Sequence, residues 1–194
     1  MRKIFIILFL VFFECTNPFD TREPEPPQTT KPSQPISTLQ NDPDSLLKLL
    51  QLAFREPNWN YYNAILIDPV RFGTNFIFIP QHDVAYRMQG WTRQDEINYF
   101  VQLTQNRKKN ELNLQIYNIE GPVQIGASVD TLQTQFSYQL EIPQKNKTEY
   151  YRGQAIFRIL RSSQSLWYVF HWEDRIGSDD KTDSTWSVLK INFR

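Results

Sequence analysis

The side chain best suited to proton-transfer chemistry is His171, one of only two histidines in the 194-residue chain. Residues 167–174 are predicted to form a strand, and His171 would share one face of that strand with Trp167 and Val169. An imidazole in apolar surroundings titrates near neutrality and could act as a general base. The alternative is a histidine at the end of a sheet, hydrogen-bonded or solvated, that carries out no chemistry.

The second candidate for chemistry is Cys15, the only cysteine in the chain. It follows Arg2-Lys3 and an apolar run over residues 4–13, a layout typical of an export signal and too short to span a bilayer. Residues 1–15 resemble the signal peptide of a bacterial lipoprotein, in which a cysteine at this place is acylated and becomes the mature N-terminus. Glu14 does not fit the resemblance, because such signals carry a small residue directly before the cysteine. A plain export signal or an uncleaved anchor with an incidental cysteine stays open.

Residues 16–41 have a composition that predicts a disordered, proline-rich tether. They hold six of the twelve prolines and few aliphatic side chains, so they cannot build a packed element. A tether between an acylated Cys15 and a folded domain would hold that domain away from a membrane. The lipoprotein resemblance therefore implies a lipid-anchored protein of the cell envelope, on the periplasmic side of the outer membrane or at the cell surface. The membrane would be a partner through the lipid on Cys15.

Composition and charge exclude several classes of function. The chain has 21 basic and 21 acidic residues, and residues 42–194 carry 17 of each. This balance argues against a nucleic-acid partner, which requires a basic surface. One cysteine excludes an internal disulfide framework and a cysteine-rich zinc site, and two histidines leave little for a metal centre. We find no phosphate-binding glycine loop and no nucleophile elbow, so no cofactor and no metal is expected.

The periodicity of residues 42–194 predicts helices first and strands afterwards. Asn41 or Asp42 would cap a first helix that begins at Pro43, and Thr92 would cap the third. A second helix is expected over 59–66, a short strand over 76–80, and further strands over 112–116, 131–142, 150–161, 167–174 and 186–193. This order predicts an α+β fold, with the helices packed on one face of a curved antiparallel sheet.

Several motifs add a resemblance to this pattern of elements. They are Trp91 before the third helix, the run Gly153-Gln154-Ala155-Ile156-Phe157, and the endings 167–169, 172–174 and 185–190, each of which contains a tryptophan. With the order of elements, they make residues 42–194 similar to the nuclear transport factor 2-like, or SnoaL-like, domains. The resemblance implies a cystatin-like cone, with the N-terminal helices in the concave face of the sheet. It does not imply an activity, because this fold hosts enzymes, transport factors and binding modules.

The resemblance also implies a place for His171. Enzymes with this fold hold an acid or base inside the cone, opposite tyrosine hydroxyls, which here would come from Tyr138 and Tyr151. The expected pocket is lined by Trp91, Phe136, Tyr138, Tyr151, Phe157 and His171. Core packing is the alternative for the tyrosines. An open cavity would favour an enzyme, whereas a cavity filled by aromatic side chains would favour a module without catalysis.

The opposite face of the strand 167–174 is also apolar. It would carry Tyr168, Phe170 and Trp172, with Ile156 on the neighbouring strand. A sheet covered by helices on one side normally presents a polar second face, so an aromatic patch there requires cover. We expect a homodimer or a protein partner on this face.

Two hypotheses for function follow. The favoured one is a lipid-anchored, non-catalytic module of the cell envelope that binds a small apolar ligand or a protein partner. The alternative is a small SnoaL-like lyase or isomerase that uses His171 as acid or base in the cone cavity.

Overall fold

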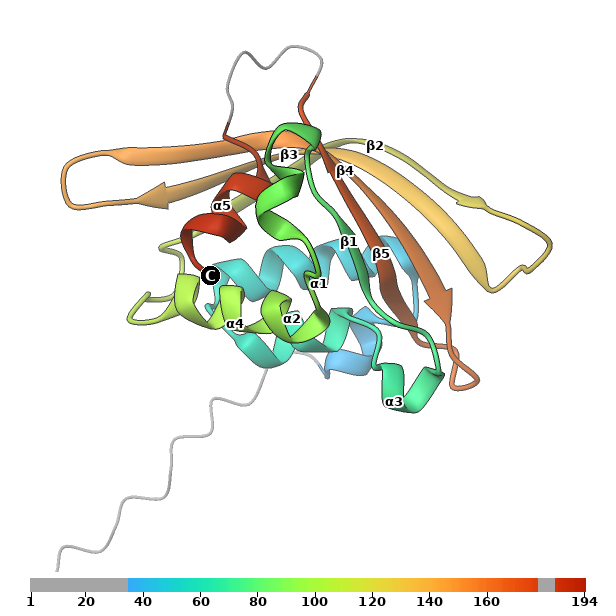
Figure 1. Ribbon diagram of the computed structural model, residues 1–194. Helices are drawn as coiled ribbons and strands as arrows, with labels where there is room; N and C mark the ends of the chain where they lie inside the picture. Colours follow the sequence, from blue (N-terminus) through green and yellow to red (C-terminus); the bar gives the residue numbers. More distant parts are fainter. Residues whose placement is uncertain (1–34, 178–183) are drawn as a thin grey trace, which may run out of the picture. The chain divides into compact units, whose positions relative to one another are not determined.

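The computed structural model describes residues 35–177 and 184–194. The predicted export signal, Cys15 and most of the predicted tether lie outside the described residues. Within them, the α+β prediction is confirmed: the helices lie beneath the arch of a five-stranded sheet (Figure 1). Among the helices of the described residues, none is long and apolar enough to cross a membrane.

The sheet has the strand order β1-β5-β4-β3-β2. Its strands are β1 (Ile77–Ile79), β2 (Asn113–Gln124), β3 (Thr131–Pro143), β4 (Thr148–Arg161) and β5 (Trp167–Arg175). Strands β2 to β5 form an antiparallel meander, as predicted, but β1 pairs with β5 in parallel, so the sheet is mixed. The reason is that the chain already runs beside β5 before β1 begins, since Ile67 N donates to Val169 O at 2.9 Å.

Four of the described helical segments begin at a residue whose side chain caps the helix. They are η1 (Ile36–Leu39), α1 (Pro43–Arg55), α2 (Trp59–Ile65), α3 (Pro69–Phe72), η2 (His82–Met88), α4 (Arg93–Thr104) and α5 (Trp186–Asn192). The Asp42 carboxylate accepts from Ser45 N at the start of α1, and Thr92 forms a capping box with Asp95 at the start of α4. Both helix starts were predicted from the sequence.

The folded part begins earlier than residue 42. Residues 36–39, which the composition assigned to the tether, form the 3-10 turn η1. Gln40 is buried, and its carbonyl accepts from Trp167 N at 2.8 Å. This hydrogen bond ties the segment to the start of β5, so the end of the predicted tether is part of the domain.

The C-terminal segment is a helix, and the predicted strand over 186–193 is wrong. Trp186, Leu189 and Lys190 are fully buried, and their spacing places them on one side of α5. The first backbone groups of α5 find partners from the sheet. Trp186 N donates to the Tyr138 hydroxyl at 2.7 Å, and Ser187 N donates to the Asp174 carboxylate at 2.6 Å. These tertiary caps are absent from the local sequence, whose short apolar pattern suits a strand as well as a helix.

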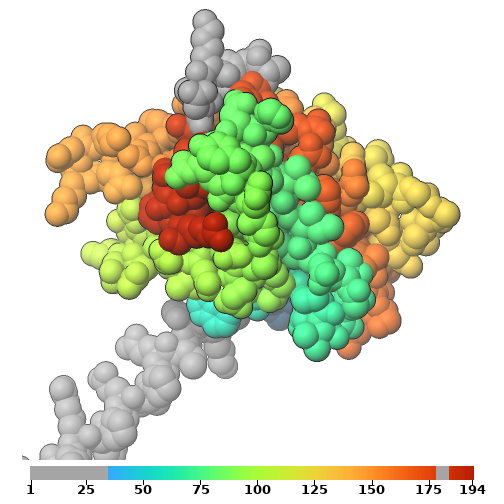
Figure 2. Space-filling view, in the orientation of Figure 1, coloured from blue at the N-terminus to red at the C-terminus, as the bar shows by residue number. Residues whose placement is uncertain are grey.

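The core between the helices and the sheet is aromatic. Its fully buried members include Phe54, Tyr62, Phe100, Phe136, Phe157, Trp172 and Trp186. Many of the rings meet edge to face, for example Trp172 and Trp186 with centroids 4.6 Å apart, whereas Tyr62 and Phe100 are stacked. Helix α5 packs against η2 and β4, and Figure 2 shows α5 and η2 side by side on one face of the domain.

Candidate functional site

A bulge in β5 decides where His171 points. Arg158 of β4 pairs with His171, but the next residue, Ile159, pairs with Val169, so Phe170 is an extra residue in the strand. One extra residue exchanges the two faces of the strand beyond it. The structure therefore corrects the predicted place of His171: it lies on the outer face of the sheet, not inside the cone.

The surroundings of His171 are those of a neutral histidine on a sheet surface. Burial, and to a smaller extent the positive charge of Arg158, lower its pKa below the ordinary value, while Glu173 acts in the opposite direction. Its Nε2 atom is buried and has no hydrogen-bond partner among the described residues. A base for a substrate in the cone would have to face the cone, and this imidazole does not.

The other residues of the predicted pocket do face the interior, where they pack against one another. Trp91, Phe136, Tyr138, Tyr151 and Phe157 are all buried. The Phe136 and Phe157 rings meet edge to face at 4.9 Å, and Phe157 meets Trp172 at 4.7 Å. These side chains are therefore packed core residues.

The interior holds an ion pair between Glu96 of α4 and Lys190 of α5, which we did not single out from the sequence. Both side chains are fully buried, with Lys190 Nζ 2.8 Å from Glu96 Oε1. The carboxylate also accepts from the Tyr62 hydroxyl at 2.5 Å and from Trp91 Nε1 at 2.8 Å. The ammonium lies 3.4 Å from the ring centroid of Phe78. Burial lowers the pKa of Lys190 to about 8, so it remains charged at neutral pH beside Glu96.

A second buried carboxylate, that of Asp174 at the end of β5, also accepts hydrogen bonds from groups of the chain itself. It accepts from the Tyr138 hydroxyl at 2.6 Å and from both the backbone N–H and the hydroxyl of Ser187. Burial raises its pKa, and these hydrogen bonds oppose the rise. The two interior carboxylates thus hold the helices and the sheet together.

The predicted interface patch is largely covered by the protein. Trp172 lies in the core, because the bulge turns it inward, and Ile156 is only 5% exposed. Tyr168 is covered by α3, where the Phe72 ring lies 4.9 Å from its own. Phe170 is partly buried against the core. Sequence reasoning missed the most exposed apolar residues near this patch.

These residues are Ile77 and Ile79 of the edge strand β1, which are 46% and 41% exposed. Their partners across the parallel pairing are His171 and Glu173, both on the outer face of β5. The sequence signal that could have identified this edge is the pair of isoleucines at the two ends of the three-residue strand β1. Exposed apolar side chains on an edge strand indicate a surface for a partner.

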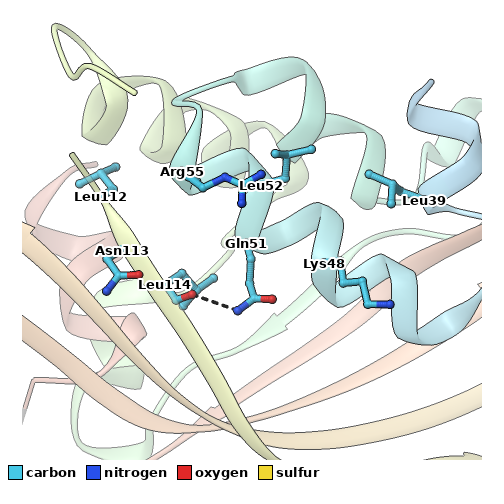
Figure 3. Close-up of a pocket in the computed structure, with 8 residues that line it drawn as sticks. All are labelled: Leu39, Lys48, Gln51, Leu52, Arg55, Leu112, Asn113 and Leu114. Atoms are coloured by element: carbon cyan, nitrogen blue, oxygen red, sulfur yellow. Dashed lines mark hydrogen bonds between the residues drawn. The ribbon is translucent and has the colours of Figure 1, made fainter. Parts of the chain in front are cut away.

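A groove of about 600 Å³ lies between α1 and the edge strand β2 (Figure 3). Four leucines and four polar residues line it: Leu39, Leu52, Leu112, Leu114, Lys48, Gln51, Arg55 and Asn113. Lys48, Gln51 and Arg55 follow one another on one side of α1, with spacings of three and four residues. The amphipathic character of α1 creates this wall, since its opposite side is buried in the core.

Two hydrogen bonds hold the walls of the groove in place. Gln51 Nε2 donates to Leu114 O at 3.1 Å, which joins α1 to the edge of β2. Asn110 N donates to Arg55 O at 2.6 Å, which fixes the loop before β2 against the end of α1. The groove is therefore framed by ordered elements.

The described residues offer no metal centre. No group of three or more histidine, cysteine, aspartate or glutamate side chains among them is placed to hold an ion.

Comparison with known proteins reveals a shared fold. No known protein family and no curated protein matches the sequence. A conserved protein from Planctomyces limnophilus is similar in structure, with a TM-score of 0.53 and 11% identity over 68% of this chain and 91% of that chain. A protein of unknown function from Mycobacterium tuberculosis matches with a TM-score of 0.51 and 9% identity, over 77% of this chain and 81% of that one.

A third structure, described as an NTF2-like protein of unknown function in nutrient uptake from Rhodospirillum rubrum, matches with a TM-score of 0.48. It is 11% identical and covers 70% of this chain and 98% of its own. Sequence identities this low indicate a shared fold only, and they give no information about a shared activity.

Removal of one partner of the buried ion pair tests its structural role. Lys190→Met should lower the free energy of unfolding by about 3–5 kcal/mol, because Glu96 is left buried without its counter-charge. The double variant Lys190→Met/Glu96→Gln should recover part of this loss, since no unpaired charge remains. Urea unfolding followed by tryptophan fluorescence measures both.

The control is Lys109→Met, which breaks the surface ion pair with Glu56 and should cost about 0–1 kcal/mol. Equal losses for Lys190→Met and Lys109→Met would contradict the structural role of the buried pair.

Proposed function

We propose that this chain, whose α+β architecture is that of the nuclear transport factor 2-like cone, is a lipid-anchored, non-catalytic binding module of the cell envelope. Its ligand site is the groove between α1 and β2. The observation that carries this proposal is the filled interior. Its aromatic side chains are buried, and tyrosine hydroxyls donate hydrogen bonds to both buried carboxylates. The concave space open to a ligand lies outside the core.

The groove has the properties of a site for a small molecule. Its volume of about 600 Å³ lies within the range of about 300–1,000 Å³ that is usual for such sites. It combines an apolar floor of leucines with a few polar groups at fixed positions. This combination supports a small ligand with an apolar part.

The geometry disfavours the alternative, a lyase or isomerase that uses His171 in the cone. The imidazole lies on the outer face of the sheet, beside Arg158 and Glu173. Glu96 and Asp174, the acids that do face the interior, are fully buried and hydrogen-bonded to the chain. An acid or base needs a substrate within hydrogen-bond reach, and the packed interior leaves no such place beside them.

The membrane anchor remains a proposal that rests on the sequence of residues 1–41. The support is the short apolar run before Cys15 and the proline-rich composition after it. A lipid on Cys15 would place the domain at the periplasmic side of the outer membrane or at the cell surface.

A homodimer or protein partner on the outer sheet face also remains a proposal, now centred on β1. Ile77 and Ile79 are exposed apolar residues there, and they pair across the sheet with His171 and Glu173 of β5. Edge strands with exposed apolar side chains readily pair with another chain. This edge lies at the far side of the sheet from β2, so a partner there would leave the groove accessible.

The groove is tested by a charged substitution in its apolar lining. Octan-1-ol added to the ¹⁵N-labelled full chain should shift the amide resonances of residues 48–55 and 112–114. Leu52→Glu should weaken this binding at least about tenfold, because a carboxylate replaces apolar contact area worth about 1.5–3 kcal/mol. Val70→Glu, at a residue of α3 that is 95% exposed, is the matched control and should bind like the unaltered chain. Octanol shifts confined to other elements would refute the groove as the site.

The anchor is tested by mass spectrometry of the protein extracted from membranes. We expect a mature chain that begins at Cys15 and carries acyl groups, and Cys15→Ser should move the protein to the soluble fraction. An intact Met1 or an unmodified Cys15 would rule the anchor out.

The partner surface is tested by sedimentation of the full chain. Ile77→Lys/Ile79→Lys should convert a dimer into a monomer, because two charges would be buried in the interface. Val70→Lys, an equally drastic change elsewhere, should leave the dimer intact. A monomer in the unaltered chain at all concentrations would exclude the homodimer.

A further inference from the structure

The charges of the groove between α1 and β2 point to a more specific ligand. Its lining carries two cations, Lys48 and Arg55, and no carboxylate. Both cations are exposed and neither forms an ion pair with a described residue. The cationic wall is therefore open to an anion from outside the chain.

Two of the acids that flank the groove are engaged by other cations. Glu56, which follows Arg55, pairs with Lys109 at 2.7 Å. Glu111, which precedes Leu112, lies 3.8 Å from Arg107. Because these carboxylates already have partners, they compete little for Lys48 and Arg55.

The two side-chain amides of the groove are engaged as well. Gln51 Nε2 donates to Leu114 O, and Asn113 Nδ2 donates to the Glu141 carboxylate at 3.2 Å. One N–H of each amide is therefore engaged within the chain. The charged donors of the groove belong to Lys48 and Arg55, and donors of this kind favour an anionic acceptor.

The leucines indicate that the part of the ligand beyond its head group is apolar. Leu112 and Leu114 are buried in the floor, while Leu39 and Leu52 are partly buried and contribute accessible apolar surface. Lys48 and Arg55 are seven residues apart, which separates them by about 10 Å along the axis of α1. An apolar chain could lie over the leucines between them, with its head group at either cation.

From this arrangement, and resting on the proposed function, we infer that the groove binds a single-chain amphiphile with an anionic head. Lys48 and Arg55 hold the carboxylate or phosphate of the head group, and the leucines contact the chain. The groove volume of about 600 Å³ suits one small molecule.

The test compares ligands that share one tail and differ in the head group. The full chain is titrated with octanoate, octyl phosphate, octan-1-ol and octyltrimethylammonium, all monomeric in solution, and binding is followed by the amide resonances of residues 48–55. We expect octanoate or octyl phosphate to bind about fivefold or more tightly than octanol, and the ammonium compound to bind most weakly. Whichever of the two anions binds more tightly identifies the head group as a carboxylate or a phosphate. Added salt should weaken binding of the anions and leave octanol unchanged.

Matched variants assign the preference to the two cations. Lys48→Gln/Arg55→Gln should remove the difference between octanoate and octanol while octanol still binds. Arg87→Gln/Arg175→Gln makes the same change of charge at two exposed residues outside the groove and should keep the difference.

The outcomes separate this inference from the proposed function. Equal binding of octanoate and octanol, or tighter binding of the ammonium compound, would overturn the anionic head group and leave the groove as a binding site. Failure of all four ligands to shift the groove resonances would overturn the proposed function together with the inference.

Discussion

Two carboxylates buried in the interior, Glu96 and Asp174, impose the constraint on which the rest of the structure depends. A buried carboxylate without partners costs several kcal/mol, so each must be supplied with a cation or with hydrogen-bond donors. Helix α5 serves both: Lys190 pairs with Glu96, and Ser187 donates to Asp174. The C-terminal segment is thereby held inside the cone, where Trp186 completes the aromatic core.

This arrangement has a consequence for function. The polar groups that could have done chemistry in the cone are used to hold α4, α5 and the sheet together. The groove along α1 is a concave surface outside this interior, and its lining combines polar side chains of that helix with leucines. Among the described residues the interior is packed and the groove lies outside it, which is the basis of the proposed binding function.

The parts of the fold that were predicted from sequence are those with strong local signals. Asp42 and Thr92 cap α1 and α4 through contacts within four residues, and the long alternation of β3 and β4 defines both faces of those strands. The same reasoning failed at Phe170, where one extra residue in β5 turns His171 outward and Trp172 inward. An alternating sequence does not reveal such a bulge, because the bulge depends on the pairing with β4. The groove was missed for a similar reason, since its two walls are about 60 residues apart in the chain.

The sequence by itself determined the α+β class, the starts of α1 and α4, and the strands of the antiparallel meander, because hydrophobic periodicity and caps act over a few residues. Only the tertiary structure decided that residues 186–192 form a helix and that the acids of the cone are structural. Local preference for helix or strand in such a short segment amounts to about 1 kcal/mol or less per residue. Leaving the two buried carboxylates without partners would cost several kcal/mol, so the contacts of Glu96 and Asp174 with this distant segment stabilise its helical conformation.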